Sequence, residues 1–132
     1  LNAPSKIQIT GIVDSIKCYN DANGLISLNT TGGVLNNTIN NYSYAWFITP
    51  SGGIEKNLNE NGNSIANLPA GRVRVVAKDA NGIKEQQTFD LANPNELLLK
   101  LENSLANYCP TASKGQLLLK AYGGKSPYSI SW

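Results

Sequence analysis

The sequence predicts an all-β protein made of antiparallel β-sandwich repeats in tandem, and three observations support this prediction. Asn, Gly, Ser and Thr are abundant, and these residues favour turns and compete with helices for backbone hydrogen bonds. The apolar runs are short and rich in Val, Ile, Leu and Tyr, which suits half-buried strands. The third observation is internal self-similarity, since motifs of the first half of the chain recur in the second half.

The composition argues against several functional classes. The chain has 132 residues, enough for one domain and part of another, and its formal net charge is +2. A nucleic-acid-binding surface needs clustered basic residues, but only Arg72, Arg74 and Lys78 cluster, on one side of a predicted strand. No segment approaches the roughly 18 apolar residues of a membrane helix. No signal peptide opens the chain, as expected for an excerpt of a longer, processed protein.

The chain contains no His, which removes the usual general base and the commonest metal ligand. The nine Asp and Glu residues lie mostly at predicted turns or outward positions. We therefore expect no enzyme, no cofactor and no metal site. The two Asp-Ala-Asn-Gly stretches, 21–24 and 79–82, are similar to fragments of calcium loops. Neither continues into the twelve-residue pattern that ends in Glu, so we interpret both as hairpin turns.

The internal repeat aligns Cys18 with Cys109, which lie 91 positions apart. In both copies a Gly follows the Cys by six residues, and a Gly-Gly pair begins eight residues after that Gly. Both copies then end in Tyr-Ser-x-x-Trp, at Trp46 and Trp132, although the first copy carries five extra residues within 34–41. Cys18 and Cys109 are therefore predicted to be equivalent positions of two modules and not disulfide partners of each other.

The proline-containing tetrapeptides at 1–4 and 91–94 also correspond, at an offset of 90. Residues 1–94 are therefore predicted to contain one complete repeat, in which 1–4 are the tail of a preceding repeat. Residues 95–132 are predicted to be the N-terminal part of a second repeat.

Seven short strands are predicted within the first repeat, separated by turns rich in Gly, Pro and Asn. They are residues 6–13, 25–30, 42–49, 54–58, 64–67, 72–78 and 84–91. About seven alternating strands in about 90 residues indicate an Ig-like sandwich.

Alternation along each strand assigns the side chains to faces. Trp46 is expected at the centre of the core. The predicted inward residues are Tyr42, Tyr44, Trp46, Ile48, Ile26, Leu28, Val73, Val75, Ala77, Phe89 and Leu91. Phe47 is expected to face outward, where it either packs beneath the inserted loop, which we favour, or stacks on a sugar.

In the second repeat, residues 97–102, 116–121 and 128–132 are predicted strands. They carry an apolar face formed by Leu117, Leu119, Tyr128 and Trp132. Three strands with such a face are marginal in water. Further strands of the chain or another molecule are therefore expected to cover it.

Taken together, these motifs resemble the SprB repeat of very large cell-surface adhesins of gliding bacteria. The shared features are a Cys followed by an Asx-Gly turn, Gly-Gly before a Tyr-x-Tyr-x-Trp strand, Ile-Ala-Asn-Leu-Pro-Ala-Gly at 65–71, and Asp-Ala-Asn-Gly at 79–82. The chain departs from the pattern at Ile83, where such repeats commonly carry a Cys that is a candidate partner for the first Cys. It also departs at Val73, where Tyr is common, and in the inserted loop.

The resemblance implies a non-catalytic stalk or adhesive module, exported by type IX secretion and held at the outer-membrane surface in gliding motility or attachment. Neighbouring repeats are the implied partners, with surface glycans or other surface proteins as further candidates. Asp14-Ser15-Ile16 resembles an O-glycosylation signal of the same bacteria, which makes Ser15 a candidate modification site. Two alternatives stay open: a carbohydrate-binding accessory module of a secreted enzyme, and a structural spacer of a secretion or motility machine.

Overall fold

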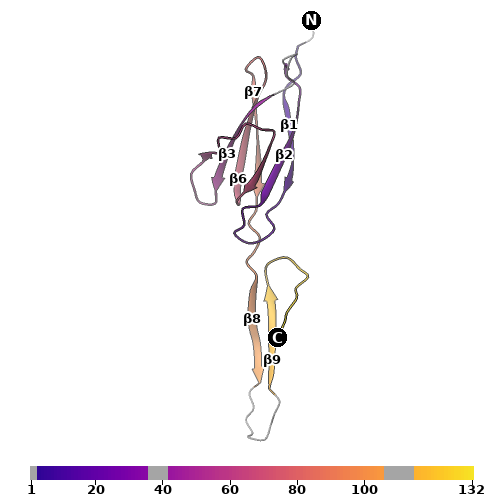
Figure 1. The fold of residues 1–132 in the computed structure, drawn as a ribbon, viewed down its shortest axis with the longest axis vertical. Helices are drawn as coiled ribbons and strands as arrows, with labels where there is room; N and C mark the ends of the chain where they lie inside the picture. Colours follow the sequence, from indigo (N-terminus) through magenta and orange to yellow (C-terminus); the bar gives the residue numbers. More distant parts are fainter. Residues whose placement is uncertain (1–2, 36–41, 106–114) are drawn as a thin grey trace.

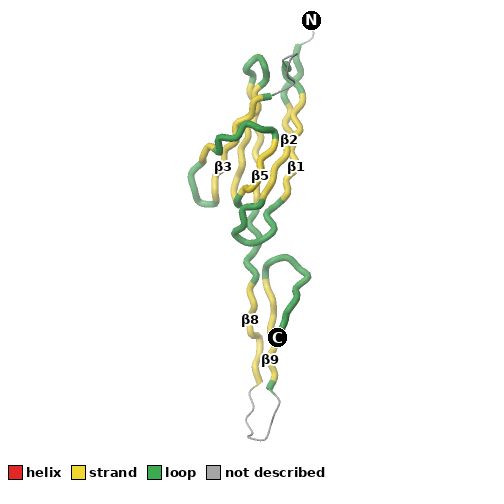
Figure 2. Tube along the Cα trace, in the orientation of Figure 1, coloured by secondary structure: helices red, strands yellow, loops and turns green. Residues whose placement is uncertain are grey.

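The computed structural model describes residues 3–35, 42–105 and 115–132. These residues form a sandwich of two antiparallel sheets followed by a separate two-stranded hairpin, and the two parts lie end to end (Figure 1). The described residues contain strands and loops but no helix (Figure 2), and hence none long and apolar enough to cross a membrane. The predicted all-β, antiparallel fold class is confirmed.

Nine strands build the described part of the chain. They are β1 (Gln8–Asp14), β2 (Gly24–Thr31), β3 (Ser43–Pro50), β4 (Lys56–Asn57), β5 (Ser64–Leu68), β6 (Gly71–Lys78), β7 (Lys84–Leu91), β8 (Leu98–Leu105) and β9 (Gln116–Tyr122). One sheet of the sandwich has the order β1-β2-β5 and the other β4-β3-β6-β7, while β8 and β9 pair only with each other. Most of these strands begin and end within two residues of the predicted positions, because the turn residues between the apolar runs set their limits.

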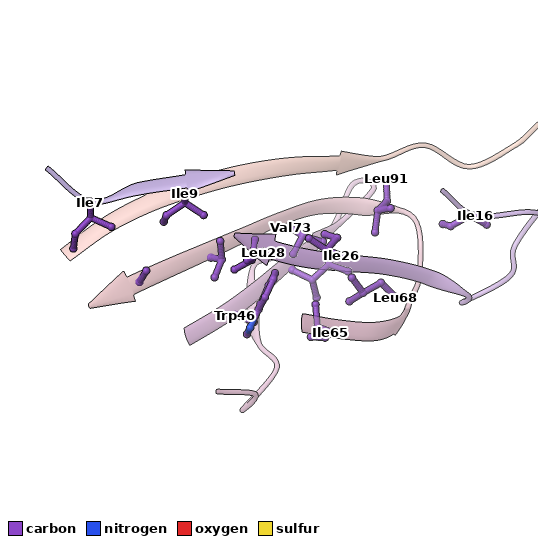
Figure 3. Packing of buried hydrophobic residues seen from close by; sticks show 13 residues of the cluster. Ile7, Ile9, Ile16, Ile26, Leu28, Trp46, Ile65, Leu68, Val73 and Leu91 are labelled. Carbon is purple, nitrogen blue, oxygen red and sulfur yellow. The ribbon is translucent and has the colours of Figure 1, made fainter. Parts of the chain in front are cut away.

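Alternating side chains of both sheets meet in one core (Figure 3). Trp46 lies at its centre with no exposed surface, and its Nε1 donates a hydrogen bond to the carbonyl oxygen of Gly62 at 2.8 Å. Tyr44 and Phe89, predicted as core residues, are half-buried and pack against the cluster. The buried apolar residues are Ile7, Ile9, Ile16, Ile26, Leu28, Trp46, Ile48, Ile65, Leu68, Val73, Val75, Ala77 and Leu91.

One predicted turn is wrong in detail. The stretch at 21–24 is predicted to be the hairpin turn itself, but the residue of this loop with a positive φ is Asn20, at 60°. Gly24 lies instead inside β2, where an added Cβ would approach the Leu68 carbonyl oxygen to 3.0 Å. Its small size therefore serves close packing between β2 and β5.

The predicted strand at 128–132 is also wrong, since these residues form no strand. In the sandwich the strand with the same alternation, β3, is held between β4 and β6. Residues 128–132 have no such backbone partner among the residues that the structure describes. Apolar alternation alone does not hold a segment in a ladder without a neighbour to bond.

Candidate functional site

The hairpins β1–β2 and β8–β9 have the same strand register over their first halves. Gln8 pairs with Thr31 in the first hairpin, and Leu98 pairs with Tyr122 in the second. From these residues onward, four successive residue pairs occupy equivalent positions in the two hairpins. A β-bulge then leaves Glu102 unpaired between Leu101 and Asn103. Because of this single extra residue, equivalent positions lie 90 residues apart before the bulge and 91 residues apart after it. The bulge therefore explains why the tetrapeptides align at an offset of 90 and the cysteines at an offset of 91.

Both hairpins also carry the same contact, here called the Gly-pair latch: Gly32, Gly33 and Tyr42 in the first copy, Gly123, Gly124 and Tyr128 in the second. The amide of Gly33 donates to the Ser5 carbonyl oxygen at 2.7 Å, and that of Gly124 to the Asn95 carbonyl oxygen at 2.9 Å. The Tyr42 hydroxyl donates to the Gly32 carbonyl oxygen at 2.7 Å, and the Tyr128 hydroxyl to that of Gly123 at 2.5 Å.

The latch requires glycine for two reasons. All four glycines have a positive φ, between 55° and 80°. In addition, a Cβ on Gly32 would overlap the Lys6 carbonyl group, and a Cβ on Gly123 would overlap that of Glu96. The Gly-Gly pair therefore marks a point where the chain before each hairpin passes closely across the backbone.

In the first copy, a carboxylate links the latch to the opposite sheet by a hydrogen bond, and no such carboxylate lies at the second latch among the described residues. Asp79 is buried, and its carboxylate accepts hydrogen bonds from the amides of Val34 at 3.0 Å, Asn81 at 3.0 Å and Ile83 at 2.8 Å. These bonds, led by that from Val34, hold the pKa of Asp79 below its ordinary value. The predicted turn at 79–82 is present, with Gly82 at a φ of 83°. The Asp79 carboxylate of this turn thus accepts hydrogen bonds from backbone amides of both the turn and the latch.

The apolar residues of the two hairpins differ in what lies against them. In the sandwich, Ile26 and Leu28 are buried beneath the β4-β3-β6-β7 sheet (Figure 3). Of their counterparts, Leu117 is 57% exposed and Leu119 is half-buried, and Trp132, the counterpart of Trp46, is 84% exposed. The other exposed apolar residues of this part are Leu97, Leu98, Leu99, Leu101, Leu118, Tyr122, Tyr128 and Ile130.

The outer surface of the β4-β3-β6-β7 sheet is polar and carries two ion pairs. Arg72 Nε lies 2.9 Å from Asp90 Oδ1. Arg74 donates two hydrogen bonds to the Glu55 carboxylate, from Nε at 2.9 Å and from Nη2 at 2.6 Å. The Arg74 hydrogen bond lowers the pKa of Glu55. Phe47 faces this surface as expected, but Arg74 covers its ring at 4.2 Å from the centroid. The ring is therefore packed against a guanidinium, an arrangement that neither sequence alternative included.

The remaining candidate residues lie apart from one another. Cys18 is an exposed free thiol in the loop after β1, and Cys109 lies outside the described residues. Ser15 is exposed, directly after the last residue of β1. Within residues 3–35, 42–105 and 115–132, no three potential metal-ligating side chains gather at one point.

The comparisons with protein-family models, with curated proteins and with solved structures find no match to this chain. The SprB resemblance therefore continues to rest on the sequence motifs.

Proposed function

We propose that this chain is a non-catalytic segment of a tandem array of Ig-like repeats, and that the array is a stalk or adhesive part of a large bacterial cell-surface adhesin. The observation that carries the proposal is the equivalence of the two hairpins. They share register, Gly-pair latch and tyrosine hydrogen bond, and they follow each other along one chain. Repeated modules that contact mainly their neighbours suit a role as spacer or stalk.

In this proposal β8–β9 is the first hairpin of a second sandwich. The exposed Leu117 and Trp132 then correspond to Ile26 and Trp46, which the first sandwich buries completely. In a sheet equivalent to β4-β3-β6-β7, residues 128–132 would take the place of β3, and this sheet would cover the apolar residues of β8–β9.

The alternative of a carbohydrate-binding accessory module with an aromatic platform receives less support. Trp46 has no exposed surface and Phe47 is covered by Arg74, so neither of these two rings offers a free face. Export and attachment at the outer membrane rest on the SprB resemblance.

A chimera tests the equivalence of the hairpins. Residues 1–127 are joined to a second copy of residues 42–93, so that the second Tyr42 takes the place of Tyr128. We expect a second sandwich to form, in which the added tryptophan is buried and shielded from fluorescence quenchers. The matched control begins the second copy at residue 43, because a slip of one residue turns every side chain of the strand to the other face. Equal quenching of the two chimeras would contradict the proposal.

Surface location needs its own test. Antibodies against this segment should label intact cells of the source organism, and brief protease treatment should remove the labelling. Labelling that appears only after the cells are permeabilised would contradict the adhesin proposal while leaving the repeat structure untouched.

A further inference from the structure

The outer surface of the β4-β3-β6-β7 sheet contains a cationic hollow that extends from Arg74, at one end, to two lysines at the other. Lys78 of β6 and Lys84 of β7 are directly opposite each other in the register. Like charges in this position destabilise a strand pair. Within the described residues no carboxylate lies within salt-bridge distance of either ammonium group, whereas Arg72 and Arg74 both have carboxylate partners.

Beside the two lysines the surface is shallowly hollowed, with a volume of about 370 Å³. Its floor is aliphatic, formed by Ala45 of β3 and Val76 of β6, which are paired in the register. Ser43, at the lysine end, adds a hydroxyl group, while Phe47 and Arg74 border the hollow at the other end. The hollow thus combines a flat apolar strip with two ammonium groups that have no carboxylate partner among the residues that the structure describes.

We propose that this hollow binds a carboxylated polysaccharide, with Lys78 and Lys84 bonding the carboxylates and the Ala45–Val76 strip contacting the C–H face of a sugar ring. Lysine ammonium groups bind carboxylates through charge-assisted hydrogen bonds, which are stronger than neutral ones. The proposal concerns the first sandwich alone and does not depend on whether the chain belongs to a repeat array.

Other polymers fit the hollow less well. Single-stranded nucleic acids bind by stacking their bases on free aromatic faces, and the ring of Phe47 is occupied by Arg74. An extended peptide binds by adding a strand to a free sheet edge, whereas the floor of the hollow lies on the face of the sheet, over the paired residues Ala45 and Val76. The shallow hollow also lacks the deep apolar pocket that anchors most protein partners.

Affinity gel electrophoresis of the whole chain tests the proposal, with polygalacturonate in the gel as probe. Dextran serves as the neutral polysaccharide and duplex DNA as an unrelated polyanion. We expect polygalacturonate to retard the protein and dextran not to. The retardation should weaken as salt is added, because exposed charges are screened within about 10 Å at 0.1 M ionic strength.

Two double variants locate the site. Lys78→Gln with Lys84→Gln should weaken binding at least about tenfold, since two charge-assisted contacts are lost. Lys100→Gln with Lys120→Gln is the matched control, because it removes the same charge from another directly opposed lysine pair, on β8–β9. We expect this control to bind polygalacturonate as the unaltered chain does.

A third variant, Val76→Glu, places a carboxylate in the floor of the hollow, diagonally opposite Lys84 of the neighbouring strand β7. It should abolish binding while preserving the sheet, because opposite charges on neighbouring strands attract. Burial of Trp46, followed by its fluorescence, verifies folding in every case. The proposal is overturned if the Lys78/Lys84 variant binds as tightly as the unaltered chain, if both lysine-pair variants lose affinity equally, or if duplex DNA is retarded as strongly as polygalacturonate is.

Discussion

The hairpins β1–β2 and β8–β9 share register and latch, but only one of them is covered. In β1–β2, Ile26 and Leu28 are buried against the sheet that carries Trp46. In β8–β9, Leu117 is largely exposed, although the backbone hydrogen bonds and the tyrosine contact are the same in kind. Local sequence motifs therefore determine the shape of the hairpin. The second sheet determines whether that hairpin contributes to a core.

Asp79 links the covered hairpin β1–β2 to the sheet that covers it. Its carboxylate bonds the amide of Val34, directly after the Gly-pair latch, from a turn 45 positions away in the chain. The latch of β8–β9 receives no such bond among the described residues. The comparison predicts that perturbations of the covered hairpin change the stability of the sandwich, whereas matched perturbations of the uncovered hairpin do not.

The largest contrast is expected between the two tryptophans. Trp46→Ala removes a fully buried side chain and should lower the free energy of unfolding of the sandwich by roughly 3–5 kcal/mol. Trp132→Ala removes an exposed one and should change it by less than about 0.5 kcal/mol. Urea denaturation of both variants measures the difference. Similar losses would mean that the hairpin and the sandwich unfold as one unit.

A smaller contrast is expected at the latch glycines. Gly32→Ala forces a side chain into a positive φ and against the Lys6 carbonyl group, and should cost about 1–3 kcal/mol. Gly123→Ala suffers the same clash in β8–β9, yet should leave the unfolding midpoint of the sandwich unchanged. Gly52→Ala is a further control, since its φ is also positive but open space surrounds it. The conclusion fails if Gly52→Ala is as costly as Gly32→Ala.

Acid should weaken the hydrogen bond, here called the Asp79 clamp, between the Val34 amide and the Asp79 carboxylate. The folded-state pKa of Asp79 lies below its ordinary value of 3.8, so its contribution is fully present above that value. The contribution is lost as the pH falls through the lowered folded value. We expect amide exchange at Val34 to quicken below about pH 4 relative to Gly124, which has no carboxylate partner.

Two variants separate this clamp from other acid effects. Asp79→Asn should remove the pH dependence at Val34. Glu55→Gln alters the exposed carboxylate whose pKa Arg74 lowers, and should leave Val34 unaffected. Persistence of the Val34 response in Asp79→Asn would assign it to another group.

The smallest effect is expected from the tyrosine hydroxyl groups. Tyr42→Phe removes the hydrogen bond to the Gly32 carbonyl oxygen and should cost about 0.5–1.5 kcal/mol. Tyr128→Phe removes the corresponding bond of the uncovered hairpin and should not change the stability of the sandwich. Thermal melts of the two single variants and the double variant check both expectations. A cost in the double variant beyond that of Tyr42→Phe would show that the latches are coupled.

The sequence permitted the prediction of strands and faces because each depends on neighbouring residues. Alternation from Tyr42 to Ile48 puts Trp46 on the inward face, and turn residues bracket most strands. Residues 128–132 show the limit of this reasoning. They have the same alternation as β3 but no strand neighbour to bond, and strand formation depends on that neighbour.

The functional details were harder to find because they depend on contacts between distant segments. Nothing near Asp79 in the sequence indicates that Val34 would donate to it. The bulge at Glu102 had a signal, namely the change of offset from 90 to 91 between the two alignments. The opposed lysines could also have been predicted from the sequence, because the short predicted turn at 79–82 places Lys78 opposite Lys84.

The directions of β1 and β7 bear on how the sandwich would respond to tension. β1 begins at the N-terminal end of the sandwich and β7 ends at the opposite end, where residues 92–97 lead to β8 (Figure 1). Each is bonded to one antiparallel neighbour, β2 or β6, by hydrogen bonds that run perpendicular to the strands. A pull along the long axis therefore shears both ladders, so many bonds bear the load together and none is peeled off alone. A sandwich joined in this way is suited to resist unfolding when it is pulled at its two ends.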